Sequence, residues 1–201
     1  MTEKDWTGNS RTTFATLGAS SHSNHEREVN DYYATDPDAI NRLLAVTTLN
    51  KEKEIWECAC GEGHLSKRLM DFGYKVKSTD LIDRGFGFGN VDFLKVNETP
   101  EYDGTILTNP PYSKALEFCQ KALSLVSKGN KVYMFLRIQF LETTKRGDWF
   151  KSGKSGLKTV YVFDKRIGCW MNGKPNGSSA TAYCWFEFEK GFTGDAIIRW
   201  C

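Results

Sequence analysis

Residues 54–63 of the 201-residue chain read Glu54-Ile55-Trp56-Glu57-Cys58-Ala59-Cys60-Gly61-Glu62-Gly63, and this pattern is the strongest indication of the fold class. An apolar strand pattern over 54–60 runs into a Gly-x-Gly turn, and a helical pattern follows until Gly73 would end it. A strand, a glycine turn and a helix in this order form the nucleotide-binding unit of α/β proteins. Ser66 stands where a third glycine would complete the dinucleotide fingerprint, which argues against a nicotinamide or flavin site.

Strand and helix patterns alternate on both sides of this stretch. Thr35 or Asp36 can cap a first helix, with Pro37 at its first position. Strand patterns cover 54–60, 74–80, 105–108 and 131–137, helical patterns cover 62–72 and 113–127, and later strand patterns cover 158–163, 181–188 and 196–200. This alternation predicts an α/β domain with a parallel sheet.

Two acidic positions follow the glycine turn. Asp80 comes seventeen residues after Gly63, at the end of a strand pattern, where a carboxylate could accept both hydroxyls of a ribose. Asp92 and Phe93 come next and suit an adenine ring. The structural alternatives are a capping Asp80 and a turn-forming Asp92.

Asn109-Pro110-Pro111-Tyr112 follows the apolar run at 105–108 and is typical of a site for a planar amine. The exocyclic amine of adenine is a poor nucleophile, because its lone pair is delocalised into the ring. The Asn109 side-chain oxygen and the Pro110 carbonyl could each accept one amine N–H and draw the nitrogen toward tetrahedral geometry. The prolines hold these acceptors in place, and Tyr112 offers a flat face for stacking. The alternative is a connection in which Asn-Pro only turns the chain.

Together these segments resemble the S-adenosylmethionine-dependent amino-methyltransferases with an Asn-Pro-Pro-Tyr signature, most closely the small adenine-specific DNA methyltransferases of phages and prophages. The resemblance runs from about residue 27 to the C-terminus. It implies a Rossmann-like class I methyltransferase fold with a seven-stranded, mostly parallel sheet and an antiparallel edge hairpin. The implied activity is methyl transfer from S-adenosylmethionine to the N6 amine of adenine in DNA.

The resemblance also implies roles for individual residues. The implied catalytic residues are Asn109, Pro110, Pro111 and Tyr112, and the implied cofactor-binding residues are Tyr33, Thr35, Glu57, Cys58, Gly61, Gly63, Asp80, Asp92, Phe93 and Asn109. Tyr33 and Thr35 belong to a segment at 27–37 that is similar to the family's N-terminal cofactor segment. Many members of the family carry Asp where this chain has Glu57. The sequence Cys58-Ala59-Cys60 before the glycines is also unusual for the family.

Length and composition predict a polar, flexible arm at 1–26 and a single catalytic domain at 27–201. No apolar stretch reaches the ~18 to 20 residues that a membrane span needs, and no signal segment is present, so a cytoplasmic protein is expected. The six cysteines contain no Cys-x-x-Cys pair, which predicts reduced thiols and no metal site.

The nucleic acid partner is predicted from local charge, since a net charge of +2 does not indicate one by itself. Between residues 145 and 174 eight basic side chains stand against two acidic ones. Lys165, Arg166 and Trp170 are the candidate contacts, the last in an irregular segment at 167–180 that would edge the target pocket. A solvated surface is an equal alternative. Base selection must come from loops, the arm, a dimer partner or another protein, because no separate recognition domain fits.

Two glycine-rich segments have weaker signals. Gly147 to Ser155 superficially suggests a phosphate-binding loop, but five residues separate its glycines where four are required, so a solvated loop is expected. Arg84 to Asn90 alternates glycine and aromatic residues, which suggests nucleic-acid stacking, but its position between Asp80 and Asp92 favours a cofactor-side loop.

Three other functions remain open. An RNA adenine methyltransferase would use the same loop. A glutamine-amide (N5) methyltransferase acting on protein would also present an amide nitrogen to Asn-Pro-Pro-Tyr, but members of that class usually carry a helical domain ahead of the catalytic fold. An inactive cofactor-binding regulatory module is the third, and the intact Asn109 and Tyr112 argue against it.

Overall fold

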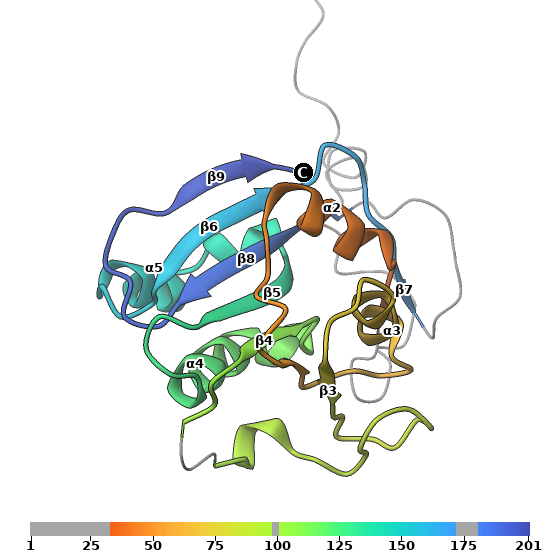
Figure 1. Cartoon of the computed structure of the whole chain (residues 1–201). Helices are drawn as coiled ribbons and strands as arrows, with labels where there is room; N and C mark the ends of the chain where they lie inside the picture. Colours follow the sequence, from red (N-terminus) through yellow and green to blue (C-terminus); the bar gives the residue numbers. More distant parts are fainter. Residues whose placement is uncertain (1–32, 98–100, 172–180) are drawn as a thin grey trace, which may run out of the picture.

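The structure, a computed structural model, describes residues 33–97, 101–171 and 181–201 (Figure 1). The predicted arm at 1–26 and the first part of the predicted cofactor segment, 27–32, lie outside the described residues. The strands are β1 (Tyr33–Thr35), β2 (Ile55–Glu57), β3 (Val76–Ser78), β4 (Thr105–Thr108), β5 (Lys131–Arg137), β6 (Leu157–Val162), β7 (Cys169–Met171), β8 (Tyr183–Glu189) and β9 (Ile197–Trp200). The helices are α2 (Asp38–Val46), α3 (His64–Asp71), α4 (Ala115–Leu125) and α5 (Thr144–Lys151), with short 3₁₀ turns η1 (Phe93–Lys95), η2 (Tyr112–Lys114) and η3 (Ile138–Leu141). None of the described helices is long and apolar enough to cross a membrane.

Seven strands form the main sheet, in the order β3-β2-β4-β5-β8-β6-β9. Strand β8 runs antiparallel to both of its neighbours, β5 and β6, whereas the other pairings in this sheet are parallel. The antiparallel hairpin that the resemblance implies therefore corresponds to β6 and β8. Strand β9 pairs parallel with β6 and forms the edge of the sheet beyond it. This confirms the predicted fold class, a mostly parallel seven-stranded α/β sheet.

Helices cover both faces of the sheet because each strand alternates its side chains between two cores. On β5, Val132, Met134 and Leu136 face the core that α4 and α5 cover. The intervening Tyr133 and Phe135 face the core beneath α2 and α3. Figure 1 shows these two helix pairs on opposite sides of the strands.

The order of the strands places the two main sequence motifs together. Strand β2 lies between β3 and β4, so the chain winds first to one side of β2 and then to the other. Ligands of open α/β sheets bind where the winding reverses, beyond the carboxyl ends of the strands. The glycine turn follows β2 and Asn109 follows β4, so both motifs border this crevice.

The prediction of a solvated loop at Gly147–Ser155 is wrong for the first half of that segment, since α5 extends to Lys151. The Thr143 hydroxyl caps this helix by accepting the Arg146 backbone N–H. Trp149 and Phe150 pack against the core, which stabilises a helix whose sequence contains a glycine. Residues 152–156 form the turn into β6.

A second correction concerns the segment at 167–180, which was expected to be irregular. Cys169–Met171 form β7, which pairs antiparallel with β1 in a separate two-stranded ribbon, hereafter the β1–β7 ribbon. Its register places Thr35 opposite Cys169. Residues 172–180 lie outside the described residues.

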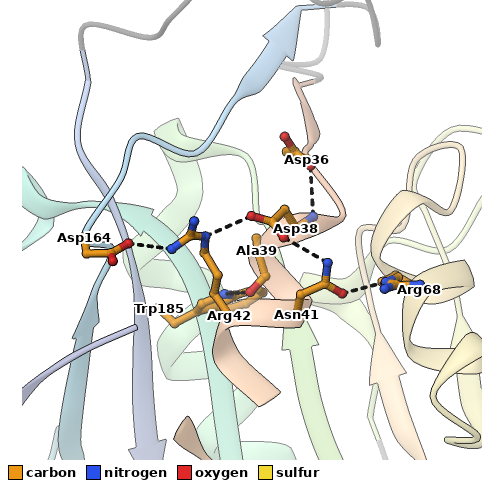
Figure 2. Close-up of polar contacts among 8 residues, drawn as sticks. All are labelled: Asp36, Asp38, Ala39, Asn41, Arg42, Arg68, Asp164 and Trp185. Atoms are coloured by element: carbon orange, nitrogen blue, oxygen red, sulfur yellow. Dashed lines mark hydrogen bonds and ion pairs between the residues drawn. The ribbon is translucent and has the colours of Figure 1, made fainter. Parts of the chain in front are cut away.

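Polar contacts of α2 fasten the chain around this ribbon (Figure 2). The Arg42 guanidinium joins Asp38, one turn earlier, to Asp164 in the connection between β6 and β7. At the start of the helix, Asp36 accepts the backbone N–H of Asp38; the helix begins at Asp38, so Pro37 precedes its first position and does not occupy it as predicted. The buried Trp185 indole donates to the Ala39 carbonyl at 2.9 Å and so ties α2 to the sheet.

Candidate functional site

A cavity of about 290 Å³ opens at the carboxyl ends of β2, β3 and β4. Most of the residues predicted from the sequence line it, namely Thr35, Glu57, Cys58, Asp80, Asp92, Phe93, Asn109, Pro110, Pro111 and Tyr112. These residues come from five separate segments of the chain, which the fold brings together around one space.

Gly61 and Gly63 do not themselves line the cavity, although Cys60 and His64 on either side of their turn do. Gly61 and Gly63 both have positive φ angles, of 54° and 80°, which side chains other than glycine rarely adopt. A Cβ atom added to Gly63 would also lie 2.3 Å from the Phe86 ring, so the ring closes against this glycine. The predicted cofactor-side loop thus packs directly on the turn, and its Arg84 also lines the cavity.

Asp80 fastens the same turn to β3. It is 9% exposed, and its two carboxylate oxygens accept the backbone N–H groups of Gly61 at 2.8 Å and Ile82 at 2.9 Å. Asp80 thus binds backbone N–H groups, as a capping residue does, but it caps none of the described helices, so the capping alternative considered for it is not found in that form. A carboxylate offers about four acceptor positions, so Asp80 can also bind hydroxyl groups in the cavity.

Glu57 is a buried carboxyl group at the end of β2, only 2% exposed although it lines the cavity. Ser66 donates a hydrogen bond to it, and the Ser66 hydroxyl in turn lies 2.7 Å from that of Ser78. Burial raises the pKa of Glu57 to about 8; the bonds from Ser66 lower it in part, and the charge of Asp80 raises it further. Glu57 is therefore largely protonated at neutral pH.

Asp92 and Phe93 lie at the start of η1. Asp92 caps this turn by accepting the Leu94 backbone N–H at 3.1 Å, so the turn-forming alternative considered for Asp92 is present. Its hydrogen bond and ion pair with Lys95 hold the pKa of Asp92 below its usual value. The buried Phe93 ring packs edge-on against Trp56, with 5.4 Å between the centroids, and thereby forms an apolar wall of the cavity.

Asn109 lies directly after β4, and its amide is held by the β1–β7 ribbon. The amide nitrogen donates to the Thr35 hydroxyl at 2.8 Å and to the Cys169 sulfur at 3.7 Å. Thr35 was expected beside a cofactor, whereas Cys169 was not among the predicted site residues. The sequence offered no signal for Cys169, because a three-residue strand has no measurable periodicity.

Tyr112 extends the same cluster. Its hydroxyl lies 3.2 Å from the Cys169 sulfur, and burial raises its pKa well above the usual value, so the phenol is neutral. The Arg137 guanidinium stands over its ring, 4.9 Å from the centroid. Arg137 was also missed, although its place at the end of β5, on the same edge of the sheet as Asn109, is a signal that could have indicated it.

Two of the predicted nucleic-acid contacts, Lys165 and Arg166, do not line the cavity. Lys165 and Arg166 are exposed in the connection between β6 and β7. Trp170 lies in β7, opposite Ala34 of β1. Tyr33 begins β1, and its place is known from the backbone pairing with Met171. Lys114, which the sequence analysis also missed, is exposed and lines the cavity two residues after Tyr112.

No family profile and no curated protein matches the sequence. Solved structures match it in fold. A candidate class I S-adenosylmethionine-dependent methyltransferase from Listeria monocytogenes has a TM-score of 0.60 at 13% identity, over 94% of this chain and 71% of that chain. A candidate RNA methyltransferase from Pyrococcus horikoshii has 0.59 at 15% identity, over 94% of this chain and 98% of that one. The modification subunit of a candidate type I restriction enzyme from Vibrio vulnificus has 0.57 at 10% identity, over 93% and 48%. The chain therefore has the Rossmann-like fold of class I methyltransferases.

Proposed function

We propose that the protein transfers a methyl group from S-adenosylmethionine to the N6 amine of adenine in DNA, as the small phage and prophage enzymes that it resembles do. The observation that carries the proposal is one cavity lined both by Glu57, Asp80 and Asp92 and by Asn109 and Tyr112. A nucleotide-like cofactor and a planar amine could therefore meet in the same space. The class I methyltransferase fold of the structural neighbours supports this function.

The residues of the cavity fit S-adenosylmethionine. Asp80, held by two backbone N–H groups, would accept the ribose hydroxyls, and Phe93 beside Asp92 would contact the adenine ring. Glu57 and Cys58, with Tyr33, Gly61 and Gly63 nearby in the proposed arrangement, would surround the methionine part. When bound, S-adenosylmethionine supplies an electrophilic methyl group on its sulfonium sulfur.

Asn109 and Pro110 would make the target nitrogen a better nucleophile. The Asn109 side-chain oxygen and the Pro110 carbonyl would accept the two amine N–H groups and direct the nitrogen lone pair away from them, toward the methyl group. Pro111 would keep the loop rigid, and the Tyr112 ring would stack on the base. The amine becomes strongly acidic once it is methylated, so solvent can take its proton and the chain needs no general base.

Exposed cations, two of them beside the cavity, support a nucleic acid as the substrate. Lys114 lines the cavity, Arg137 stands over Tyr112, and Lys165 and Arg166 lie on the connection into the β1–β7 ribbon. Such side chains contact phosphates without reading sequence, so loose or short-sequence specificity is expected. A base in a duplex would have to be flipped into the cavity, at a cost of a few kcal/mol.

RNA is the second candidate substrate. The observation that favours it is the likeness to the candidate RNA methyltransferase from Pyrococcus horikoshii, which extends over 98% of that chain. Single-stranded or loop adenines also avoid the cost of flipping.

Labelled methyl transfer tests the proposal directly. Unmethylated genomic DNA, total RNA and a bacterial protein extract are each incubated with methyl-labelled S-adenosylmethionine, and the products are hydrolysed and identified. Label in 6-methyladenine of DNA is the expected result, and Asn109→Ala should lower its rate of formation on the order of 10²- to 10³-fold. Label only in RNA or on glutamine would replace DNA as the substrate, and no transfer despite cofactor binding would favour an inactive or partner-dependent module.

A further inference from the structure

The Asn109 amide group is held by two side chains that lie far apart in the sequence. Its nitrogen donates to the Thr35 hydroxyl and to the Cys169 sulfur, at 2.8 and 3.7 Å. A primary amide nitrogen carries two N–H donors, so it can serve both of these contacts at once. The oxygen end of the amide is then the end that can accept a hydrogen bond from an amine in the cavity.

Thr35 and Cys169 are not independent neighbours, because they face each other across the β1–β7 ribbon. Directly opposed residues of an antiparallel pair place their side chains on the same face. Thr35 is 3% exposed, so its hydroxyl is shielded from competing water. The Cys169 sulfur also lies 3.2 Å from the Tyr112 hydroxyl. A single cross-strand pair therefore contacts both the Asn109 amide and the Tyr112 hydroxyl of the Asn-Pro-Pro-Tyr loop.

The ribbon is itself anchored next to this pair. The Asp36 backbone N–H donates to the Gly168 carbonyl at 3.1 Å, directly beside the last paired residues. Arg42 joins Asp38, which follows β1, to Asp164, which precedes β7 (Figure 2). Both strands of the ribbon are thus tied close to Thr35 and Cys169, which limits the movement of the groups that hold Asn109.

We propose that Thr35 and Cys169 are positioning residues that set the orientation of the Asn109 amide, so that its oxygen and not its NH₂ group faces the target amine. This inference rests on the proposed methyl transfer to an amine. An inverted amide would direct N–H donors at the N–H donors of the substrate and would lose the acceptor that activates the nitrogen. Thr35 would then orient a residue of the catalytic loop. This role replaces the contact with the methionine part of the cofactor that the family resemblance implies for Thr35.

Substitution of Thr35 separates these two roles. Thr35→Val keeps the branched shape that suits a strand but removes the acceptor, whereas Thr35→Ser keeps the hydroxyl and is the matched control. At saturating cofactor and substrate, the single-turnover rate should fall on the order of 100-fold in Thr35→Val and less than about threefold in Thr35→Ser. The dissociation constant for S-adenosylhomocysteine should stay within about twofold in both variants, since the amide and not the cofactor is affected. A weakened cofactor complex with an unchanged rate at saturation would overturn the inference.

A second readout does not depend on activity. The side-chain amide protons of Asn109, assigned by their loss in Asn109→Ala, should exchange slowly with solvent in the wild type and Thr35→Ser and faster in Thr35→Val. Cys169→Ala should release one of the two protons. Equal exchange in all variants would refute the positioning role even if methyl transfer is confirmed. Slow exchange in a wild type that methylates no adenine would support the amide orientation while refuting the proposed function.

Discussion

Replacing Glu57 by glutamine should remove a large pH dependence from the stability of the protein. The pKa of Glu57 is raised from 4.5 to about 8, chiefly by burial. Below pH 4.5 the carboxyl group is protonated in both the folded and the unfolded chain. As the pH rises from there to about 8, the unfolded chain ionises first, so the folded state holds the extra proton and its stability falls. Glutamine cannot ionise, and its contribution stays constant over this interval.

The size of the effect follows from the interval between the two pKa values. Each pH unit is worth about 1.4 kcal/mol, so the range from 4.5 to about 8 corresponds to about 5 kcal/mol. About 3 kcal/mol of this falls between pH 5.5 and 8. The free energy of unfolding of Glu57→Gln, relative to the wild type, should therefore increase by about 3 kcal/mol over that range.

Urea unfolding at pH 5.5, 6.5, 7.5 and 8.5 measures this difference. Glu187→Gln is the matched control, since Glu187 is equally buried. Burial pushes the pKa of Glu187 upward, but the hydrogen bonds from Lys131 and Tyr161 outweigh it and hold the pKa below 4.5. The control should differ from the wild type by the same amount at every pH above 5.5. If Glu57→Gln shows the same flat difference, Glu57 is ionised in the folded protein and the reasoning fails.

Three further outcomes are expected. Asn109→Ala should lower the methyl-transfer rate on the order of 10²- to 10³-fold while leaving the affinity for S-adenosylhomocysteine near that of the wild type, as single-turnover assays and calorimetry would show. Asp80→Asn should weaken cofactor binding at least about tenfold, because one carboxylate oxygen becomes an NH₂ group that faces a backbone N–H donor; unchanged binding would remove Asp80 from the cofactor site. Gly63→Ala should destabilise the protein by more than about 1 kcal/mol in urea unfolding, and clearly more than Gly129→Ala, which has a similar positive φ but nothing within 4 Å of the added Cβ, whereas that of Gly63 meets Phe86.

The meeting of the two main motifs could be predicted from the sequence, because it depends on general rules. Gly61 and Asn109 each follow an apolar strand in an alternating α/β pattern, and such strands present their carboxyl ends at one edge of a sheet. The order of the strands then made β2 and β4 neighbours. Asp80 was found in the same way, at the end of a strand and at a suitable distance from the glycines.

The groups that orient the loop could not be found in this way. Cys169 and Thr35 meet across strands of three residues each, and their pairing depends on the course of the whole intervening chain. The helix α5 was missed for a different reason. Gly147 lowers the local helix propensity, and packing of Trp149 and Phe150 on the core overrides it. In both places tertiary contacts decide the structure, and local sequence does not.

The position of β8 has a consequence for the synthesis of the protein. This strand lies between β5 and β6, although the ribosome makes it after both of them. Until residues 183–189 have emerged, β5 and β6 each present an unpaired edge to other chains. Half of the sheet must therefore wait for a late segment, a non-local pairing that slows folding. Nascent chains stalled before β8 should accordingly be the species most prone to aggregate and most dependent on chaperones.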